Sequence, residues 1–484
     1  MQRVLFQRVF GMLLALTGGT HLIPLITALI FQDGSRMAFS ISSIGLMLIG
    51  ALIWYPARHH KLDLRLREGF LVVGMSWMTM VLAGTVPMVM LEGHPISWVD
   101  AFFESMSGLT TTGATVLTGL DNMPKGLLMH RALLQWLGGM GIIVLAVAIL
   151  PMLRIGGMQL YRAETPGPMK DSKLPPRITE TAKALWMVYL GLTVLCALAY
   201  FSAGMNIFDA ITHSFTTVPT GGYSNYDTSI SYFNSPLIEI IASVFMIIGG
   251  ANFALHYLAW RRATAQVYQQ DAELKVYLWL LMIFAVIASG GIYFYGVEDH
   301  LSDAIRHGVF MTVSAMTSTG YTLDSFYLWP SFLPIFFVFI VFIGGCAGST
   351  GGGMKVIRIM LLYKQAIREV LRVIHPTAIT TVKINGRAVE SRVISAVWAF
   401  FFIYMTIYAI CSVILVATGL DMVTAFSAVA ACLTQLGPSL GGVGAHYGDI
   451  NDFAKVLLSF IMLLGRLEIF TLLVLFTPAY WKDV

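Results

Sequence analysis

Four short apolar stretches of the sequence end in a similar turn that is centred on a glycine. Rings of backbone carbonyls can replace the water around a cation, and glycine permits the dihedral angles that direct carbonyls at one axis. In each stretch a hydroxyl residue follows the aligned glycine by two positions and could fix the turn or offer another oxygen. The turn residues that could form such a site are Thr111, Thr112, Gly113, Thr220, Gly221, Gly222, Ser318, Thr319, Gly320, Leu436 and Gly437.

A single stretch of this kind would be interpreted as an ordinary helix with a glycine cap. The four copies are in register, however, because each short stretch begins near a residue that lies thirteen positions before its aligned glycine. These residues are Asp100, Asp209, His307 and Thr424. Four half-membrane helices would direct their negative carboxyl ends at a shared centre, which favours a cation. The repetition therefore predicts a four-fold degenerate pore for a monovalent cation.

The elements that position these turns must be stable in lipid. Hydrophobic residues make up 57% of the 484-residue chain, charged residues make up 12%, and the mean hydropathy is +0.75. Soluble domains contain about a quarter charged residues, so the lipid bilayer is the simplest solvent for most of this chain. The net charge of +4 does not suggest a nucleic-acid partner. The cysteines lack metal-ligand or disulfide spacing and are expected to be small buried residues: Cys196, Cys346, Cys411 and Cys432.

Apolar runs long enough to cross a bilayer recur along the chain. We expect ten spans, at 9–31, 38–57, 69–91, 131–152, 184–204, 236–260, 275–296, 331–363, 392–418 and 455–478. The shorter apolar stretches are expected to be re-entrant or buried helices, at 98–112, 206–221, 303–319 and 421–436. The predicted fold is an all-α polytopic membrane protein with about ten transmembrane helices.

Lysine and arginine gather after the second, fourth, sixth and eighth predicted spans, and basic residues mark the cytoplasmic side. This alternation predicts that both termini are cytoplasmic and that the four short helices enter from the outer side. The apolar run from Val9 to Phe31 is too long for a signal peptide and is expected to be retained. The proline-containing loop from Leu153 to Lys183 is expected to be extended.

The short helices divide the chain into an N-terminal transmembrane helix pair and four tandem helix–pore-loop–helix repeats. The pair is expected at 1–60, and the pore repeats are expected at 69–152, 184–262, 275–365 and 390–478. All four repeats have the same order of span, short helix, glycine turn and span.

A glycine-rich run from 344 to 353 interrupts one predicted span, and such a run cannot hold a stable helix. It could be a simple kink, a site of tight packing between helices, or a mobile loop that crosses the pore below the turns. Its glycines are Gly344, Gly345, Gly348, Gly351, Gly352 and Gly353.

Arg466 lies near the middle of the last predicted span, where a charge normally faces protein or water. It could form a salt bridge that only holds helices together, although Glu468, two residues on, would face elsewhere on a helix. Lys355 and Arg358 directly follow the glycine-rich run and are expected to be charges at the cytoplasmic boundary.

Acidic residues begin two of the short helices, where the helix dipole favours them. We expect Asp100 and Asp209 to act mainly as helix caps, with attraction of cations as a secondary role. The sequence assigns no role to Glu104 or His213, which follow one turn later.

The chain resembles the Trk/Ktr/HKT superfamily of potassium transporters, and most closely its bacterial TrkH type. The resemblance covers essentially the whole chain. It includes the additional N-terminal helix pair, the segment Leu109-Thr110-Thr111-Thr112-Gly113-Ala114-Thr115, the glycine-rich run 344–353 and the segment Gly465-Arg466-Leu467-Glu468.

This resemblance implies that Gly113, Gly222, Gly320 and Gly437 form a selectivity filter whose backbone carbonyls bind K⁺. Family members with serine at the first of these positions tend to favour sodium, so Gly113 implies potassium. The resemblance also implies that the glycine-rich run is an intramembrane gate, with Arg466 near it to repel cations. It further implies a homodimer, a cytosolic ring of nucleotide-binding regulatory subunits, a bacterial inner membrane location, and potassium as substrate without a tightly bound cofactor.

Three classes of function compete. A membrane enzyme would need clustered carboxylates or a nucleophile with its base, and the sequence suggests neither. A carrier for a small solute would favour inverted repeats, whereas these repeats run in parallel. Potassium uptake through a gated pore is therefore the expected function, and an obligatory proton-coupled potassium symporter is the alternative.

Overall fold

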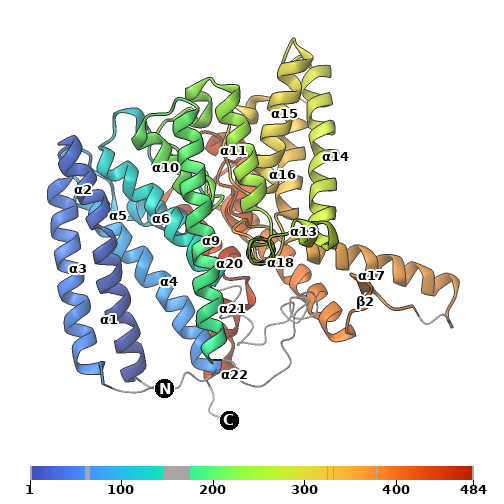
Figure 1. The fold of residues 1–484 in the computed structure, drawn as a ribbon, viewed down its shortest axis with the longest axis horizontal. Helices are drawn as coiled ribbons and strands as arrows, with labels where there is room; N and C mark the ends of the chain where they lie inside the picture. Colours follow the sequence, from blue (N-terminus) through green and yellow to red (C-terminus); the bar gives the residue numbers. More distant parts are fainter. Residues whose placement is uncertain are drawn as a thin grey trace.

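The protein is described by a computed structural model, which covers residues 3–59, 66–144, 175–323, 325–330, 332–377 and 380–481. The chain begins with α1 (Arg3–Thr20), α2 (Leu22–Phe31) and α3 (Arg36–Ala57). These helices stand together at one side of the molecule (Figure 1). A side chain at Gly11 or Gly50 would collide with the backbone of the opposite helix, because small residues let α1 and α3 approach closely.

The remainder of the chain repeats one order of elements four times. A long helix is followed by a short helix, an extended turn and a second helix, and we call each set a unit. Unit one has α4 (Leu66–Val89), α5 (Trp98–Leu109) and α6 (Lys125–Val144), and unit two has α9 (Pro175–Ser202), α10 (Ile207–Thr217), α11 (Pro236–Gly249) and α12 (Phe253–Arg262). Unit three has α14 (Ala272–Phe294), α15 (Leu301–Met316), α16 (Leu333–Ile343) and α17 (Val356–Ile374), and unit four has α18 (Ser391–Ala417), α19 (Met422–Thr434), α20 (Asp452–Arg466) and α21 (Phe470–Leu473).

The expected short helices are confirmed as α5, α10, α15 and α19. The smaller elements include α13 (Gln266–Gln270), α22 (Pro478–Trp481), and a hairpin of β1 (Lys383–Ile384) and β2 (Arg387–Ala388). The predicted proline-containing loop 153–183 lies largely outside the described residues, as does the end of the predicted first repeat beyond residue 144.

Among the described residues, six helices are long and apolar enough to cross a membrane. Two bent pairs bring the number to eight if each pair is one span: α11 with α12, at 92°, and α20 with Phe470–Phe476, at 108°. The predicted spans 236–260 and 455–478 are therefore bent rather than straight. The all-α polytopic membrane fold is as expected, and the count of ten spans stays a prediction.

The predicted span 331–363 differs most from the structure. It consists of α16, which ends at Ile343, and of α17, which begins only at Val356. α17 carries charged residues along one side, and Figure 1 shows it extending away from the helical body together with the small hairpin. Because of these charges, α17 is not an apolar continuation of α16.

The four units meet at a centre that is buried but polar. Threonines at the carboxyl ends of the short helices are fully enclosed: Thr110, Thr112, Thr217, Thr317, Thr319 and Thr434. Buried hydroxyls normally need hydrogen-bond partners, so this centre is a built polar site inside an apolar shell.

Candidate functional site

Three of the short helices begin with a side-chain cap. Ser97, Asn206 and Asp421 accept hydrogen bonds from the backbone N–H groups of Asp100 (3.1 Å), Asp209 (2.8 Å) and Thr424 (3.0 Å). The expected cap role of Asp100 and Asp209 is therefore wrong, because Ser97 and Asn206 already occupy the cap positions. Both carboxylates lie in the first turn instead, where the helix dipole still favours them.

All four turns have the same unusual backbone. The aligned glycine and the residue two positions before it both have positive φ: Thr111 (55°) and Gly113 (83°), Thr220 (54°) and Gly222 (76°), Ser318 (55°) and Gly320 (85°), Gln435 (62°) and Gly437 (87°). The intervening residue donates its N–H to the carbonyl five residues earlier, in the pairs Thr112–Ser107, Gly221–Thr216, Thr319–Ser314 and Leu436–Ala431. Positive φ is uncommon for residues other than glycine, so its recurrence at equivalent positions marks a specific structure.

The four turns close into a ring. A Cβ atom added to Gly113 would lie 2.2 Å from the carbonyl oxygen of Gly221 in the second turn. A Cβ atom added to each of the other glycines would likewise lie close to a carbonyl oxygen of the following turn. The distances are 1.9 Å from Gly222 to Thr319, 2.0 Å from Gly320 to Leu436 and 2.6 Å from Gly437 back to Thr112. Each glycine thus lies against the carbonyl that precedes the aligned glycine of the next turn, and only glycine fits there.

Buried tyrosines tie neighbouring turns together. The Tyr223 hydroxyl lies 3.2 Å from the carbonyl oxygen of Ala114 in the first turn. The Tyr447 hydroxyl donates to the Gly437 carbonyl, and its backbone N–H donates to the Thr115 carbonyl, both at 2.8 Å. These contacts fix the relative positions of the turns from outside the ring.

Three of the four hydroxyl residues that follow the glycines fix the turns through their side chains. Their partners lie on the short helices behind the ring. The contacts join Thr115 to Glu104 (3.0 Å), Ser224 to His213 (3.1 Å) and Ser439 to Ser427 (2.9 Å). Glu104 and His213, which had no role from the sequence, are therefore supports of the first and second turns.

The glycine-rich run is a loop between α16 and α17, rather than a kink in one helix, and it lies directly below the ring. The Gly353 N–H donates to the Thr434 carbonyl at 3.1 Å, and a Cβ atom on Gly352 would lie 2.0 Å from that same oxygen. The Thr350 hydroxyl donates to the carbonyl of Val218 at 3.1 Å. The loop thus contacts the carboxyl ends of short helices from the second and fourth units.

Arg466 joins this loop to the rest of the molecule. Its buried guanidinium donates to the carbonyl of Thr350 at 2.9 Å and to that of Gly138 at 3.4 Å. Within the part of the chain that the structure describes, these partners are carbonyls and not a carboxylate. The interpretation of Arg466 as one half of a helix-joining salt bridge is therefore wrong, and Glu468 is indeed not its partner.

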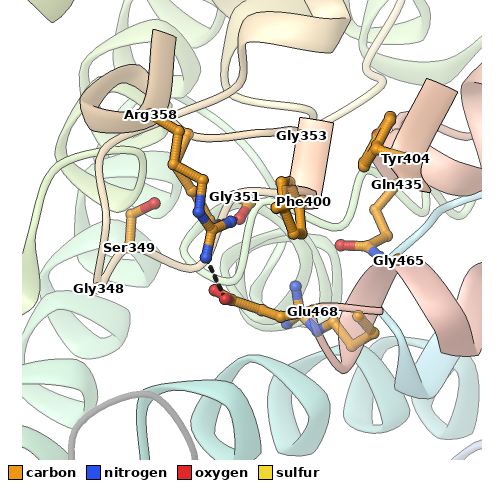
Figure 2. A pocket seen from close by; sticks show the side chains of 13 residues that line it. Gly348, Ser349, Gly351, Gly353, Arg358, Phe400, Tyr404, Gln435, Gly465 and Glu468 are labelled. Carbon is orange, nitrogen blue, oxygen red and sulfur yellow. Dashed lines mark hydrogen bonds and ion pairs between the residues drawn. The ribbon is translucent and has the colours of Figure 1, made fainter. Parts of the chain in front are cut away.

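Glu468 pairs instead with Arg358, across a small pocket below the loop (Figure 2). Arg358 is only 8% exposed, and its guanidinium lies 4.2 Å from the ring centre of Phe400. The Lys355 ammonium donates to the Gly351 carbonyl. Lys355 and Arg358 both line this pocket, and their expected place at the cytoplasmic boundary stays a prediction.

This pocket is electropositive. Its lining includes the cations of Lys355, Arg358 and Arg466 but only the carboxylate of Glu468. A cation that left the ring towards the loop would therefore meet a net positive charge.

The structure thus brings the predicted turn residues into one ring and places the predicted loop and Arg466 below it. Sequence reasoning missed Gln435, which has the backbone conformation of Thr111, Thr220 and Ser318. Aligning the turns position by position would have found it. Sequence reasoning also missed the buried pair of Glu104 and Arg131, which lie at 2.7 Å. The cysteines are free thiols, and three of them are buried: Cys196, Cys346 and Cys432.

The fold therefore defines a polytopic helical membrane protein in which four half-length helices meet at a ring of backbone turns. The family model for TrkH, described as a cation transport protein, matches residues 35–483. The chain belongs to this family.

Curated relatives match over almost their whole length. The chain is 50% identical to the Trk system potassium uptake protein TrkH of Vibrio parahaemolyticus serotype O3:K6, covering 98% of this chain and 99% of that one. It is 48% identical to TrkH and 37% identical to TrkG of Escherichia coli K12, again covering 98% of this chain and 99% and 97% of the relatives. The crystal structure of the potassium transporter TrkH from Vibrio parahaemolyticus superposes with a TM-score of 0.93, at 47% identity and full coverage of both chains.

Proposed function

We propose that this chain takes up potassium across the membrane through a four-fold pseudo-symmetric pore. The ring of four glycine turns carries the proposal. A potassium ion on the axis of that ring would be held by the backbone carbonyls of the turns in place of its hydration water. The names of the relatives as potassium uptake proteins support the choice of ion.

The selectivity filter in this proposal comprises the turn residues of all four units together with Gln435. Each glycine lies against the carbonyl of a neighbouring turn, so the spacing of the carbonyls depends on all four units at once. This mutual packing supports a site of fixed size, which could favour potassium over the smaller sodium ion.

The glycine-rich loop would be the gate of this pore. It lies directly below the ring, and its middle is held by Arg466 through the Thr350 carbonyl. Opening would require the loop to move aside and Arg466 to release it. The positive pocket below the loop would oppose cation passage as long as the loop is in place.

The alternative is an obligatory proton-coupled potassium symporter. The same ring and loop would serve both mechanisms, and a proton gradient would then be required for flux rather than merely accelerating it. We favour channel-like conduction because the proposed filter and the loop suffice to select and gate an ion.

Partners and location follow from the family resemblance. We propose a homodimer in a bacterial inner membrane, regulated by a cytosolic ring of nucleotide-binding subunits. The start of α1 and the last helix, α22, lie at the same end of the molecule, which supports termini on one side (Figure 1). The basic loops favour the cytoplasm for that side.

Ion flux into liposomes that contain the purified protein tests this function. Potassium and rubidium should pass faster than sodium, without a proton gradient. Flux of potassium only when a proton gradient is imposed would favour the symporter. Equal passage of sodium and potassium would contradict the proposed filter.

A further inference from the structure

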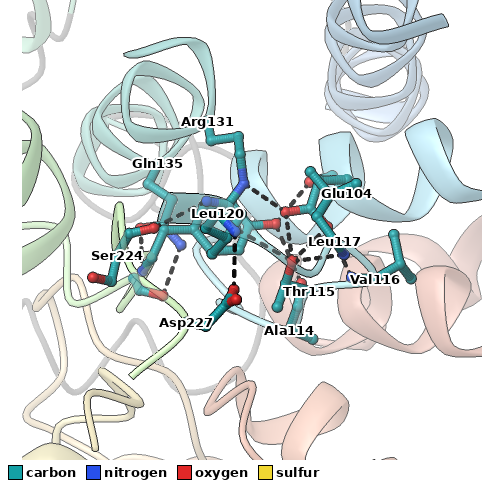
Figure 3. A network of polar contacts seen from close by, with 12 residues as sticks. Glu104, Ala114, Thr115, Val116, Leu117, Leu120, Arg131, Gln135, Ser224 and Asp227 are labelled. Carbon is teal, nitrogen blue, oxygen red and sulfur yellow. Dashed lines mark hydrogen bonds and ion pairs between the residues drawn. The ribbon is translucent and has the colours of Figure 1, made fainter. Parts of the chain in front are cut away.

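A buried arginine on α6 lies behind the first two turns (Figure 3). The Nε atom of Arg131 donates to the Glu104 carboxylate at 2.7 Å. One terminal nitrogen donates to the Ser224 carbonyl at 3.1 Å, and the other donates to the Thr115 hydroxyl at 3.3 Å. One guanidinium therefore joins the short helix α5, the first turn and the second turn.

Further contacts make this cluster rigid. The Glu104 carboxylate also accepts from the Thr115 hydroxyl, at 3.0 Å, and from the Val116 N–H, at 3.0 Å. The Arg131 guanidinium lies 4.1 Å from the ring centre of Tyr223. The Tyr223 hydroxyl in turn donates to the Glu104 carbonyl at 2.9 Å, so the cluster closes on itself.

The next turn of α6 contacts the second turn directly. Gln135, four residues after Arg131, donates to the Gly221 carbonyl at 2.7 Å and accepts from the Tyr223 N–H at 3.1 Å. The Gly221 carbonyl is the one that lies against Gly113 in the ring. Two positions on one face of α6 therefore contact the ring. Gln135 holds the Gly221 carbonyl, and Arg131 holds Thr115 and Ser224, which follow the first and second glycines.

Stability alone does not account for an ion pair at this place. Arg131 and Glu104 are almost fully buried, with side-chain exposures of 2% and 0%. Replacing a buried ion pair by apolar residues of similar volume is often neutral or stabilising. What apolar residues cannot supply is a planar group that donates in three fixed directions to three different segments.

We propose that Arg131, oriented by Glu104, is a positioning residue for ion selectivity. It sets the spacing between the first and second turns of the ring, and so the size of the site that the four units share. This inference rests on the proposed potassium pore. The buried cluster of Arg131 and Glu104 would then contribute to the selection of potassium over sodium.

The double variant Glu104→Gln with Arg131→Met tests this role. It removes both charges together, so no unpaired charge stays buried, and we expect it to fold. The sodium-to-potassium flux ratio should rise by about tenfold, the factor that corresponds to the loss of one hydrogen bond from a charged donor. The control is Glu239→Gln with Arg306→Met, which removes a 3.2 Å ion pair away from the ring and should keep the wild-type ratio.

The conservative variant Arg131→Lys keeps the charge and the contact with Glu104 but loses the fork to the Ser224 carbonyl. It should fold and show an intermediate rise in the ratio, and it decides the question if the double variant does not fold. A wild-type ratio in either folded variant would overturn the inference while leaving the potassium pore intact. A wild-type protein without preference for potassium would overturn the proposed function itself.

Discussion

The guanidinium of Arg466, at the end of α20, donates to the carbonyl of Thr350 in the glycine-rich loop at 2.9 Å. The hydroxyl of the same threonine lies within hydrogen-bond distance of the Val218 carbonyl, at the end of the second short helix, and of the Gly249 carbonyl, at the end of α11. Thr350 is therefore held from two sides, by the fourth unit and by the second. In the proposed gate, the closed position of the loop therefore depends on contacts of Thr350 with both the second and the fourth unit.

Replacing Arg466 by glutamine should open the gate. The variant loses the charged hydrogen bonds to the loop and one positive charge of the pocket below it, so potassium flux should increase by about tenfold. Arg372→Gln, which removes an exposed charge at the end of α17, is the control and should leave flux unchanged. Unchanged or reduced flux in Arg466→Gln would mean that Arg466 does not hold the loop closed.

Replacing Gly320 by alanine should impair selection. The new Cβ atom would lie 2.0 Å from the Leu436 carbonyl, so that carbonyl must move, and flux should lose its preference for potassium over sodium. Gly419→Ala is a matched control, because Gly419 also has positive φ (99°) but faces open space. If both variants kept the preference, the ring would not be the site that selects the ion.

The pair of Arg358 and Glu468 should behave as a coupled unit. Glu468→Gln removes the negative charge opposite the largely buried Arg358 and should destabilise the protein by about 3 kcal/mol. The double variant with Arg358→Met should recover most of that loss. Thermal unfolding of the purified protein measures the stability of the single and double variants. If the losses of stability from the two substitutions simply added in the double variant, the two side chains would not interact.

The cap of α19 should contribute stability that depends on pH. Hydrogen bonds from the hydroxyl and the backbone N–H of Thr424 hold the pKa of the Asp421 carboxyl below its usual range. A depressed pKa stabilises the folded protein above the pKa of the unfolded chain, about 3.9, and this contribution is lost as the pH falls through the folded value.

Asp421→Ala should therefore lower the free energy of unfolding by about 1 kcal/mol at neutral pH. Its difference from the wild type should shrink below about pH 4. Asp421→Asn keeps a capping oxygen without a titrating group and should stay close to the wild type at neutral pH. A difference between Asp421→Ala and the wild type that is constant from neutral to acidic pH would contradict the assignment.

The sequence located the turns because their chemistry is local. Positive φ favours glycine, and a half-length apolar helix must precede it, so Gly113, Gly222, Gly320 and Gly437 could be found by spacing alone. Gln435 was missed because it is neither a glycine nor a hydroxyl residue, whereas the residues with the same conformation in the other turns are threonine or serine.

Other features depend on contacts between distant segments, which composition does not encode. Arg131 and Glu104 are 27 positions apart, and Arg358 and Glu468 are 110 apart. The bend of 92° between α11 and α12 makes a single apolar run into two helices. Hydrophobicity predicted that run but not its bend, which lies where the carbonyls of Gly249 and Gly250 accept hydrogen bonds from the distant glycine-rich loop.

In the proposed pore, the four glycine turns together bind the transported ion. The most direct measurement is the anomalous scattering of rubidium in crystals of the protein grown in rubidium salt. We predict anomalous density on the axis of the ring formed by Gly113, Gly222, Gly320 and Gly437, and we predict that it persists when an equal concentration of sodium is added to the rubidium salt. Rubidium bound only elsewhere, or equally strong density in the Gly320→Ala variant, would mean that the ring is not the site that binds the ion.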